Sequence, residues 1–484
     1  RVFMKKTKIV CTIGPVSETE EMLRKLIFAG MNVARLNFSH GDYAEHGERI
    51  ARIKKVREEM GIPVAILLDT KGPEIRTGEF KCQEVFLTEG QEFTLTSRDV
   101  VGDDSICSIS YKGLPGDVKA GDVILIDDGL VELKVREVVN GEDIRCTVLN
   151  SGVIKKHKGI NVPGIRINMP PMTEKDRADI EFGIQKGIDF IAGSFVRTAE
   201  DVLAIRQVLK ENKAEHIQII SKIENREGVD NIDEIIRVSD GIMVARGDLG
   251  VEIPAEELPL LQKQIIRKCN KVGKPVITAT QMLDSMIRNP RPTRAEVTDI
   301  ANAILDGTDA IMLSGETAAG KYPVESVETM SQIARKTEEA MDYSKLLMDR
   351  HQEREATVTD AISHATCNIA MSLDASAILT ATSTGYTARM VSKFRPKQAI
   401  IATTTDERVQ RRLCLSWGVY TILLRSVEST DDLINKSVSM ALERGNVKEG
   451  DLVVITAGIP VGVGGTTNLI KAHIAGQPLP IEAR

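Results

Sequence analysis

The stretch IISKIENREG, residues 219–228, begins as an apolar β-like run and ends in charged residues. The run delivers Lys222 and Glu224 two residues apart. Two residues is the repeat of a β-strand, so both side chains leave the strand on the same face. A cation and a carboxylate at one strand end indicate either a structural ion pair or a site of chemistry.

Runs of this kind recur along the chain, and a helix-like segment follows each. Near-continuous apolar strands that alternate with amphipathic helices are typical of a parallel sheet covered on both faces. Eight such units predict a closed (β/α)₈ barrel over residues 1–70 and 170–345. The runs are KIVCTIG (8–14), NVARLNF (32–38), VAILLDT (64–70), FIAGSFV (190–196), QIISKIE (218–224), GIMVARGD (241–248), PVITATQ (275–281) and AIMLSGE (310–316).

Two other segments differ from this pattern. Residues 71–169 carry frequent turns and short alternating strands such as VILIDDG (123–129), which predict a small β-barrel lid domain inserted after the third barrel strand. From about residue 346, buried-type strands resume at SAILTAT (376–382), QAIIATT (398–404), VYTILL (419–424) and DLVVITAG (451–458). They predict an open α/β domain over residues 346–484, joined through a polar stretch at 342–360.

The composition narrows the function classes. The formal net charge of −6 gives no electrostatic reason to expect a nucleic-acid partner. No apolar run reaches the roughly 20 residues that a membrane helix needs. The seven cysteines are scattered without a CxxC pair, which favours reduced thiols in a cytoplasmic protein over zinc sites or disulfides.

Polar residues gather at the predicted strand ends, where barrel enzymes place their functional groups. Glu224 and Asp248, from neighbouring strands, supply the hard oxygen ligands that Mg²⁺ or Mn²⁺ prefers. Lys222 and Arg35 are cations suited to neutralising a transferring phosphoryl group. His40 and Arg76 could add phosphate contacts. A further set offers only oxygen ligands and one negative charge, which suits an alkali cation: Asn37, Ser39, Asp69 and Thr70.

Each feature also has a structural reading when taken alone. Lys222 and Glu224 could form an ion pair under the barrel mouth, and Asp248 could cap a helix. The LDTKGPEIR stretch (68–76) could be a charged turn, and Ser39 with His40 could cap the following helix. These readings do not explain why the residues converge on one rim, so phosphoryl chemistry is the preferred hypothesis.

The motifs together resemble the pyruvate kinase family over nearly the whole chain. They are CTIGP (11–15), GMNVARLNFSHG (30–41), LLDTKGPEIRTG (67–78), IISKIEN (219–225), DGIMVARGDLGVEIP (240–254), TATQMLDSMI (278–287), NPRPTRAE (289–296) and IMLSGETAAGKYP (311–323). The resemblance implies transfer of the phosphoryl group of phosphoenolpyruvate to ADP, giving pyruvate and ATP in the last step of glycolysis. It also implies a homotetramer, and the start of the chain is of bacterial type.

The resemblance assigns roles residue by residue. Lys222 matches the catalytic lysine, and Glu224 with Asp248 matches the divalent-metal ligands. Arg35 matches the arginine on the substrate phosphate. Gly247, Asp248 and Thr280 match positions that hold the substrate carboxylate, with Thr280 also near the face where the enolate is protonated. The K⁺ ligands are Asn37, Ser39, Asp69 and Thr70, the nucleotide contacts are Asn37, His40, Arg76 and Lys158, and the supporting residues are Ser314 and Glu316.

Two finer predictions follow from the resemblance. Glutamate at position 74 goes with K⁺ dependence in the family, whereas a lysine there goes with K⁺ independence. The loops TSTGYTAR (382–389) and AGIPVGVGGTTN (457–468) match an effector site for a phosphorylated sugar or nucleotide, with hydroxyls from Thr382, Ser383, Thr384 and Thr387. A plain strand-to-helix turn is the alternative. The chain ends at residue 484, so regulation through an extra C-terminal domain is not expected.

Two competing functions remain. Another metal-dependent barrel enzyme acting on phosphoenolpyruvate or pyruvate, such as an aldolase or mutase, would share the carboxylates. It would not need the lid, the nucleotide contacts Arg76 and Lys158, or the alkali-ion ligands. A decayed enzyme kept as a scaffold should show a broken site, and here every matched position is intact.

Overall fold

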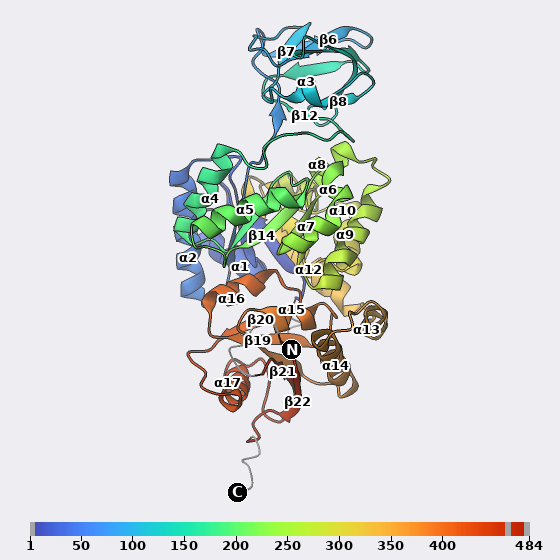
Figure 1. Ribbon diagram of the computed structural model, residues 1–484. Helices are drawn as coiled ribbons and strands as arrows, with labels where there is room; N and C mark the ends of the chain where they lie inside the picture. Colours follow the sequence, from blue (N-terminus) through green and yellow to red (C-terminus); the bar gives the residue numbers. More distant parts are fainter. Residues whose placement is uncertain (1–4, 460–465, 479–484) are drawn as a thin grey trace.

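The computed structural model describes residues 5–459 and 466–478. Figure 1 shows three parts stacked along one axis: the inserted β-rich segment at the top, the barrel in the middle and the C-terminal α/β part below it. The polypeptide enters and leaves the top part through two adjacent connections, so this part is an insertion within the barrel sequence.

Eight parallel strands close into a barrel, as the sequence predicted, and their order is β1-β17-β16-β15-β14-β13-β3-β2. Their residues are almost all buried because the strands pack against helices outside and against side chains inside. The strands are β1 Lys8–Thr12, β2 Val33–Asn37, β3 Ala65–Asp69, β13 Phe190–Gly193, β14 Gln218–Ile223, β15 Gly241–Ala245, β16 Val276–Ala279 and β17 Ala310–Leu313.

The covering helices begin at short polar caps, for example Thr19 before α1 and Asp42 before α2. Ser39 and His40 therefore do not cap α2. The helices are α1 Glu20–Ala29, α2 Tyr43–Met60, α4 Glu174–Lys186, α5 Ala199–Glu211, α6 Arg226–Asp230, α7 Ile232–Val238, α8 Arg246–Glu252, α9 Leu258–Val272, α10 Arg294–Asp306, α11 Gly315–Ala318 and α12 Pro323–Glu339, with a 3₁₀ turn at Asp284–Ile287.

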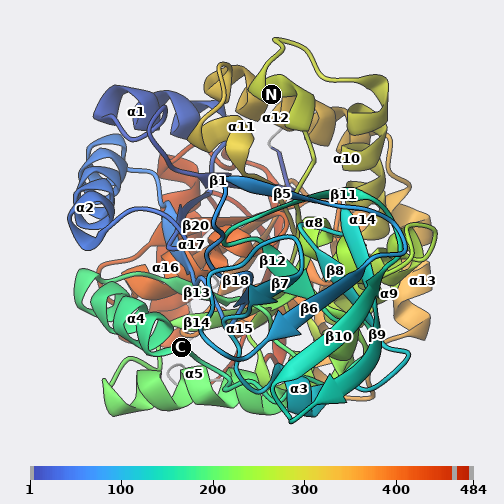
Figure 2. The same cartoon turned by 90° about the horizontal axis from the view of Figure 1, so that it is seen from above.

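The inserted segment has its own apolar core, separate from that of the barrel. It contains a seven-stranded sheet, β4-β12-β8-β9-β10-β6-β7, and a two-stranded sheet, β11-β5. Its barrel form remains a prediction. Figure 2 shows these strands lying over the barrel strands, and we call the segment the lid. Its elements are β4 Ile75–Arg76, β5 Glu84–Leu87, β6 Glu92–Thr96, β7 Ile106–Ser108, α3 Leu114–Asp117, β8 Val123–Ile126, β9 Val131–Val139, β10 Asp143–Val148, β11 Gly152–Lys155 and β12 Gly159–Asn161.

The C-terminal part is an open α/β sheet of order β20-β19-β18-β21-β22. The sequence predicted its four parallel strands but not β22, which pairs antiparallel to β21 at the edge. Its elements are α13 Tyr343–Gln352, α14 Val358–Ser372, β18 Ala377–Ala381, α15 Tyr386–Ser392, β19 Ala399–Thr404, α16 Glu407–Arg412, β20 Val419–Leu423, α17 Thr430–Glu443, β21 Leu452–Ala457 and β22 Leu469–Ile474, with a 3₁₀ turn at Leu413–Leu415.

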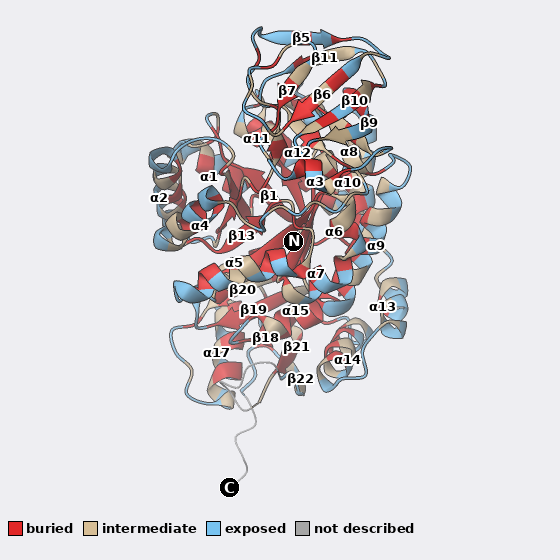
Figure 3. Cartoon of the chain, turned by 45° about the horizontal axis from the view of Figure 1, so that its top comes forward, coloured by how far each residue is buried: buried red, intermediate tan, exposed pale blue. Residues whose placement is uncertain are grey.

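The barrel and the C-terminal part meet over a buried surface. Cys414 and Leu415 join the apolar cluster that fills the inside of the barrel. Leu347 on α13 joins the C-terminal core, so the predicted boundary after residue 345 falls inside a helix that packs with the C-terminal part. Figure 3 shows buried residues running through the barrel strands and the C-terminal sheet.

Candidate active site

Lys222 lies near the end of β14, with its ammonium surrounded by oxygen atoms. Its Nζ donates to Asp69 Oδ1 at 3.0 Å and to Ser194 Oγ at 2.9 Å, and it lies 3.1 Å from Glu224 Oε1. Lys222 and Glu224 therefore share one face, as their spacing predicted. Burial alone would lower the pKa of Lys222, but the charges of Asp69 and Glu224 raise it, so the ammonium stays protonated.

Asp69, at the end of β3, holds two cations at once. Its Oδ2 accepts from Arg35 Nε at 2.7 Å, and its Oδ1 accepts from Lys222. Burial alone would raise the pKa of Asp69, but the charges of Arg35 and Lys222 lower it. Arg35 also donates to Thr12 Oγ1 at 2.7 Å, which fixes the guanidinium. The carboxylate thus holds two cations in place at the strand ends.

Glu224 and Asp248 form a pair of neighbouring carboxyl groups, of which Glu224 is buried and Asp248 is half-buried. Burial raises the pKa of Glu224 to about 7, and the nearby Asp248 charge adds to the effect. Burial also raises the pKa of Asp248. Asp248 lies in the first turn of α8 and is not its cap, which is Ala245. Two adjacent carboxylates with raised pKa values and oxygen-only donors fit a divalent cation such as Mg²⁺.

The divalent site would take few ligands from the protein. Within the described part of the chain, no group of three or more His, Cys, Asp and Glu side chains is arranged to hold a metal ion. Glu224 and Asp248 would therefore be the only carboxylate ligands from the described residues, and substrate oxygens and water would fill the remaining coordination positions of the ion. This is the usual arrangement of Mg²⁺ sites. Glu224 is fixed for this role because its Oε2 accepts from the Phe195 backbone N–H at 2.5 Å.

Thr280 follows β16 in an unusual backbone conformation. Thr280 and Gln281 have φ values of 72° and 57°, a region that β-branched residues rarely enter. The Thr280 hydroxyl accepts from Gly247 N–H at 2.6 Å and donates to the Ala279 carbonyl at 2.6 Å. The predicted substrate-carboxylate residues Gly247 and Thr280 therefore touch each other.

Arg246 supports this turn, although no role was predicted for it. Its guanidinium donates to the Thr280 carbonyl at 2.8 Å and to the Ala279 carbonyl at 3.2 Å. It also pairs with both carboxylate oxygens of Asp299 on α10, at 2.6 and 2.8 Å. This arrangement fixes the carbonyls on which the turn depends.

The predicted alkali-cation ligands come from two neighbouring strand ends. Asn37 and Asp69 are register partners on β2 and β3. Asn37 Oδ1 accepts from Ser39 N–H at 3.1 Å, and Thr70 Oγ1 accepts from Ser194 N–H at 3.1 Å. The oxygen types and their neighbouring strand positions fit a weakly charged cation, with Asp69 shared between this set and the cations Arg35 and Lys222.

Two of the four predicted nucleotide contacts, Arg76 and Lys158, line a cavity between the lid and the barrel, whereas Asn37 and His40 do not. This cavity of about 790 Å³ is lined by Glu74, Arg76, Lys158 and Asp248 among others. Arg76 bonds Glu74 Oε2 at 2.5 Å and the His157 carbonyl at 2.8 Å, and Lys158 lies 3.6 Å from Asp127. His40 is exposed, outside this cavity lining. Arg76 and Lys158, from the lid, therefore line the same cavity as Asp248, one of the two predicted metal ligands.

Ser314 and Glu316 follow β17 and stabilise the loops nearby. The Glu316 carboxylate accepts from Ser314 N–H at 2.7 Å and from Leu283 N–H at 3.1 Å. Burial raises the pKa of Glu316. Both contacts are with backbone, which fits the supporting role that the resemblance implied for these residues.

The predicted effector loop follows β18. Thr382 and Thr387 are buried: Thr382 Oγ1 accepts from Gly385 N–H at 2.8 Å, and Thr387 shares a 2.9 Å bond with Thr467. Ser383 and Thr384 are exposed, so they are the two hydroxyls of this set that can meet a ligand. In the second loop, residues 460–465 lie outside the described part of the chain.

Several residues around the site were not predicted. Ser194 bonds Lys222, the Thr70 carbonyl and Asp69, yet nothing in the FIAGSFV run distinguishes it from a core serine. Phe195 has a φ of 55°, which directs its N–H at Glu224. A local sequence pattern does not reveal the backbone conformation of Phe195 or its contact with Glu224, which is 29 residues away.

The cysteines and the helix lengths bear on two predictions about the whole chain. All seven cysteines are unpaired, and six of them are buried. Within residues 5–459 and 466–478, no helix combines the length and the apolar character needed to cross a bilayer.

Comparison with known proteins gives one consistent family. A model described as "Pyruvate kinase, barrel domain" matches residues 4–327, and one described as "Pyruvate kinase, alpha/beta domain" matches residues 360–473. A pyruvate kinase of Clostridium acetobutylicum is 59% identical over 472 residues, covering 97% of this chain and all of the relative. One from Geobacillus stearothermophilus is 59% identical, covering 97% of this chain and 80% of the relative.

A solved structure agrees with the sequence comparison. The crystal structure of a pyruvate kinase from Cryptosporidium parvum superimposes with a TM-score of 0.93 at 43% sequence identity. The match covers 97% of this chain and 96% of the solved chain.

Proposed function

Because this phosphotransferase chain belongs to the pyruvate kinase family, we propose that it transfers the phosphoryl group of phosphoenolpyruvate to ADP, using Mg²⁺ and K⁺. The observation that carries this proposal is the Lys222 ammonium, held by Asp69, Ser194 and Glu224 at the carboxyl ends of the barrel strands. A lid-covered cavity lined by Asp248, Arg76 and Lys158 lies next to it.

In the proposed reaction, a terminal phosphate oxygen of ADP attacks phosphorus while the bond from phosphorus to the enol oxygen of phosphoenolpyruvate breaks. Charge accumulates on the transferring group and on the departing enolate oxygen. Arg35 and Lys222 present fixed cations to that charge, and Asp69 keeps both oriented without a conformational search. Because these cations are already oriented, they stabilise the transition state without the reorganisation that water would need around the same charge, and this lowers the activation barrier.

Glu224 and Asp248 would hold the divalent cation, which when bound neutralises charge on substrate oxygens. Gly247 N–H and the Thr280 hydroxyl are the polar groups we assign to the substrate carboxylate. Thr280 also stands where a proton can be relayed through water to the enolate carbon, which completes pyruvate. Asn37, Ser39, Asp69 and Thr70 would hold K⁺, and Asn37, His40, Arg76 and Lys158 would contact the nucleotide.

We further propose regulation by a phosphorylated sugar or nucleotide at the loop that contains Ser383 and Thr384. Arg389, the last residue of this 382–389 segment, lies on α15 and donates to the Gly273 carbonyl at the end of α9, at 3.2 Å. The loop is thereby connected to the barrel, which supports a route for coupling. The exposed segment at 288–296 is proposed as part of a contact in a homotetramer.

The proposal is tested by measuring pyruvate formation from phosphoenolpyruvate and ADP with Mg²⁺, in K⁺ and separately in Na⁺. A panel of sugar phosphates and AMP is added to each assay. ADP-dependent pyruvate that increases with K⁺ is the expected result. No ADP-dependent pyruvate under any of these conditions would favour a scaffold protein that has lost the chemistry.

A further inference from the structure

A second cavity, of about 300 Å³, lies where the barrel meets the C-terminal part. Its walls come from α9, the end of α10, α13 and the segment just after α15. None of the residues assigned to the reaction or to the predicted effector loop lines it. The lining residues are Lys263, Arg267, Asn270, Lys271, Asp306, Arg350, Glu353, Arg354, Lys393 and Phe394. We call this the junction cavity.

The junction cavity has an excess of positive charge. Six of its lining residues are lysine or arginine, and two are carboxylates. The carboxylates are already engaged, Asp306 by Lys263 and Glu353 by Arg267. Lys271 and Arg354 are exposed, and among the described residues neither side chain has an ion-pair partner. Lys393 is paired as well, with the buried Asp360 at 2.7 Å, so among the described residues the lining cations without an ion-pair partner are Lys271, Arg350 and Arg354. These three cations focus a positive potential into the cavity.

Arg350 provides a separate indication. Its guanidinium bonds two neutral acceptors, the Lys393 carbonyl and, at 2.7 Å, Asn270 Oδ1. Burial, together with the neighbouring Arg395 charge, lowers the pKa of Arg350 to about 9. A desolvated cation without a contacting anion is costly, and an anion bound in the cavity would remove that cost.

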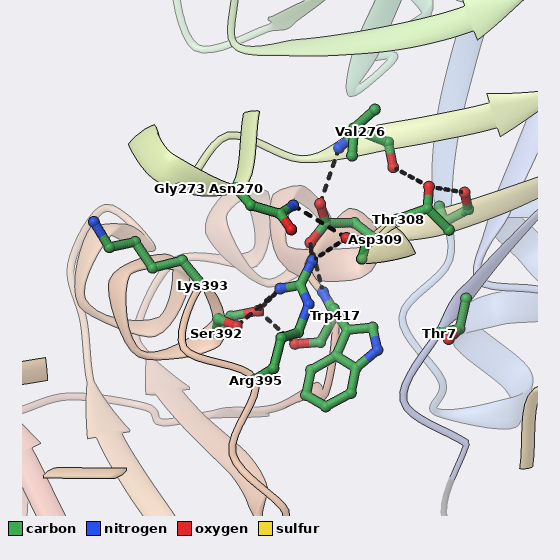
Figure 4. Close-up of polar contacts among 12 residues, drawn as sticks. Thr7, Asn270, Gly273, Val276, Thr308, Asp309, Ser392, Lys393, Arg395 and Trp417 are labelled. Atoms are coloured by element: carbon green, nitrogen blue, oxygen red, sulfur yellow. Dashed lines mark hydrogen bonds and ion pairs between the residues drawn. The ribbon is translucent and has the colours of Figure 1, made fainter. Parts of the chain in front are cut away.

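The two arginines are not equivalent. Figure 4 shows Arg395 directed at Asp309, and the pair is 3.1 Å apart and almost fully buried. Arg395 also donates to the Gly307 carbonyl at 2.8 Å and stacks on Trp417. Since Asp309 is satisfied by Arg395, by the Val276 N–H and by the Trp417 N–H, it does not neutralise Arg350 by direct contact. Among the described residues, Arg350 therefore has no carboxylate in contact with its charge.

We propose that the junction cavity binds a small molecule that carries a phosphate group. Arginine and lysine side chains recognise phosphate oxygens through charge-assisted hydrogen bonds. The volume leaves room for a sugar-sized body beside the phosphate. Because Lys271 belongs to the barrel helix α9 and Arg354 follows α13, which packs with the C-terminal part, the bound anion joins the two. It thereby stabilises the arrangement of the two parts that it contacts.

The test is equilibrium dialysis of the full-length protein against radiolabelled inorganic phosphate, and separately against glucose 6-phosphate, at constant ionic strength. The double variant Lys271→Gln/Arg354→Gln removes two exposed cations without breaking an ion pair between described residues, so it is expected to fold. The wild type should bind one more phosphate per chain than this variant, or bind it at least about tenfold more tightly, because the variant loses charged hydrogen bonds to the phosphate oxygens.

Two controls make the result specific. Lys210→Gln/Arg237→Gln removes two exposed cations on α5 and α7 that have no ion-pair partner among the described residues, and it should bind as the wild type does. Ser383→Ala/Thr384→Ala alters the predicted effector loop and should leave phosphate binding at the junction cavity intact.

The two ligands distinguish the possible occupants of the junction cavity. Tighter binding of glucose 6-phosphate than of phosphate assigns a phosphate ester, and equal binding assigns inorganic phosphate. Unchanged site number and affinity in Lys271→Gln/Arg354→Gln overturns the proposal.

Discussion

The ammonium of Lys222 lies 3.0 Å from Oδ1 of Asp69, although the two residues are 153 positions apart in the sequence. The strand β13 lies between their strands in the barrel order, so the contact spans one intervening strand at the carboxyl ends. Asp69 holds Arg35 with its other oxygen. The two cations that we propose as catalytic are thus held in place by the fold alone.

Replacing Lys222 with methionine should remove most of the phosphoryl transfer rate. Methionine keeps much of the length of the side chain but has no charge to meet the developing enolate and phosphoryl charge. We expect kcat to fall about 10³-fold or more in a coupled pyruvate assay. Lys210→Met, on the outer helix α5, is the control and should leave kcat unchanged. A Lys222→Met rate equal to wild type would contradict the assignment.

Replacing Arg246 with glutamine should impair the reaction without unfolding the barrel. The turn at Thr280 then loses two carbonyl contacts, and its left-handed residues can relax. We expect kcat to fall about 10- to 100-fold, with a smaller change in the KM for ADP than in that for phosphoenolpyruvate. A merely structural role would instead lower the thermal midpoint and leave both KM values alone.

Arg206→Gln is a matched control for the Arg246 experiment. Arg206 also bonds a backbone carbonyl, that of Val238, and a carboxylate, Asp240, but it lies on α5 away from the strand ends. It should cost stability comparable to that of Arg246→Gln and leave kcat near the wild-type value. Equal kinetic defects in the two variants would remove the special role of Arg246.

Glu74 should set the requirement for a monovalent cation. Activity in K⁺ is expected to exceed that in Na⁺ or tetramethylammonium by tenfold or more. In Glu74→Lys, a fixed ammonium would replace the monovalent cation, and the rates in the three salts should converge. The control Glu89→Lys adds the same charge at an exposed lid position and should keep the K⁺ dependence. Equal wild-type rates in all three salts would refute this prediction.

Lys8 should make stability rise with pH. Its buried ammonium donates to the Val419 carbonyl at 2.6 Å, and burial lowers its pKa from 10.5 to about 8. Since the folded pKa lies below the unfolded one, the unfolded chain binds more protons between these values, and stability increases with pH there. The full effect of that pKa difference is about 3 kcal/mol.

Comparison with Lys8→Met isolates this contribution from other titrating groups. The thermal midpoint of the wild type minus that of the variant should grow as the pH rises from about 8 to about 10, the interval between the two pKa values. The measurement is differential scanning fluorimetry across that range, with the same buffers for both proteins. A difference that stays constant would show that Lys8 titrates normally in the folded state, and one that shrinks would show that its folded pKa is raised; either result contradicts the prediction.

Arg395 should be essential to the junction between the barrel and the C-terminal part. Arg395→Met leaves the buried Asp309 carboxylate without its ion pair, which typically costs about 3–5 kcal/mol. The double variant Arg395→Met/Asp309→Asn removes the stranded charge and should recover part of the thermal midpoint. A double variant less stable than Arg395→Met alone would show that the backbone contacts of Asp309 matter more than the charge pair.

The sequence predicted the fold well because its main determinants are local. Continuous apolar runs identify buried parallel strands, and all eight barrel runs are strands in the structure. The antiparallel strand β22 was not predicted because its residues are half-buried or exposed and do not form a continuous apolar run. Helix α13 was not predicted because it is polar and has one buried residue, Leu347, so its sequence resembles that of a linker.

The site was predictable in its residue types but not in its supporting contacts. Lys222 with Glu224 was found from strand spacing, which is a local property. The Arg246–Asp299 pair spans 53 residues, and the left-handed Thr280 belongs to a residue type that does not favour that conformation. Such features depend on tertiary contacts that compensate local strain, so no window of sequence contains them.

The closure of the barrel also constrains the order of events during synthesis. Strand β1 pairs with β17, and Lys8 is the register partner of Ala310. The barrel therefore cannot close until about 310 residues have been synthesised. The lid is different, because every one of its strand pairings lies between residues 75 and 161. On the ribosome, the lid can therefore fold first, while the three barrel strands made before it, β1, β2 and β3, still lack their later partners and expose apolar surface. Premature release or stalling in that interval would leave the chain open to chaperone capture and aggregation.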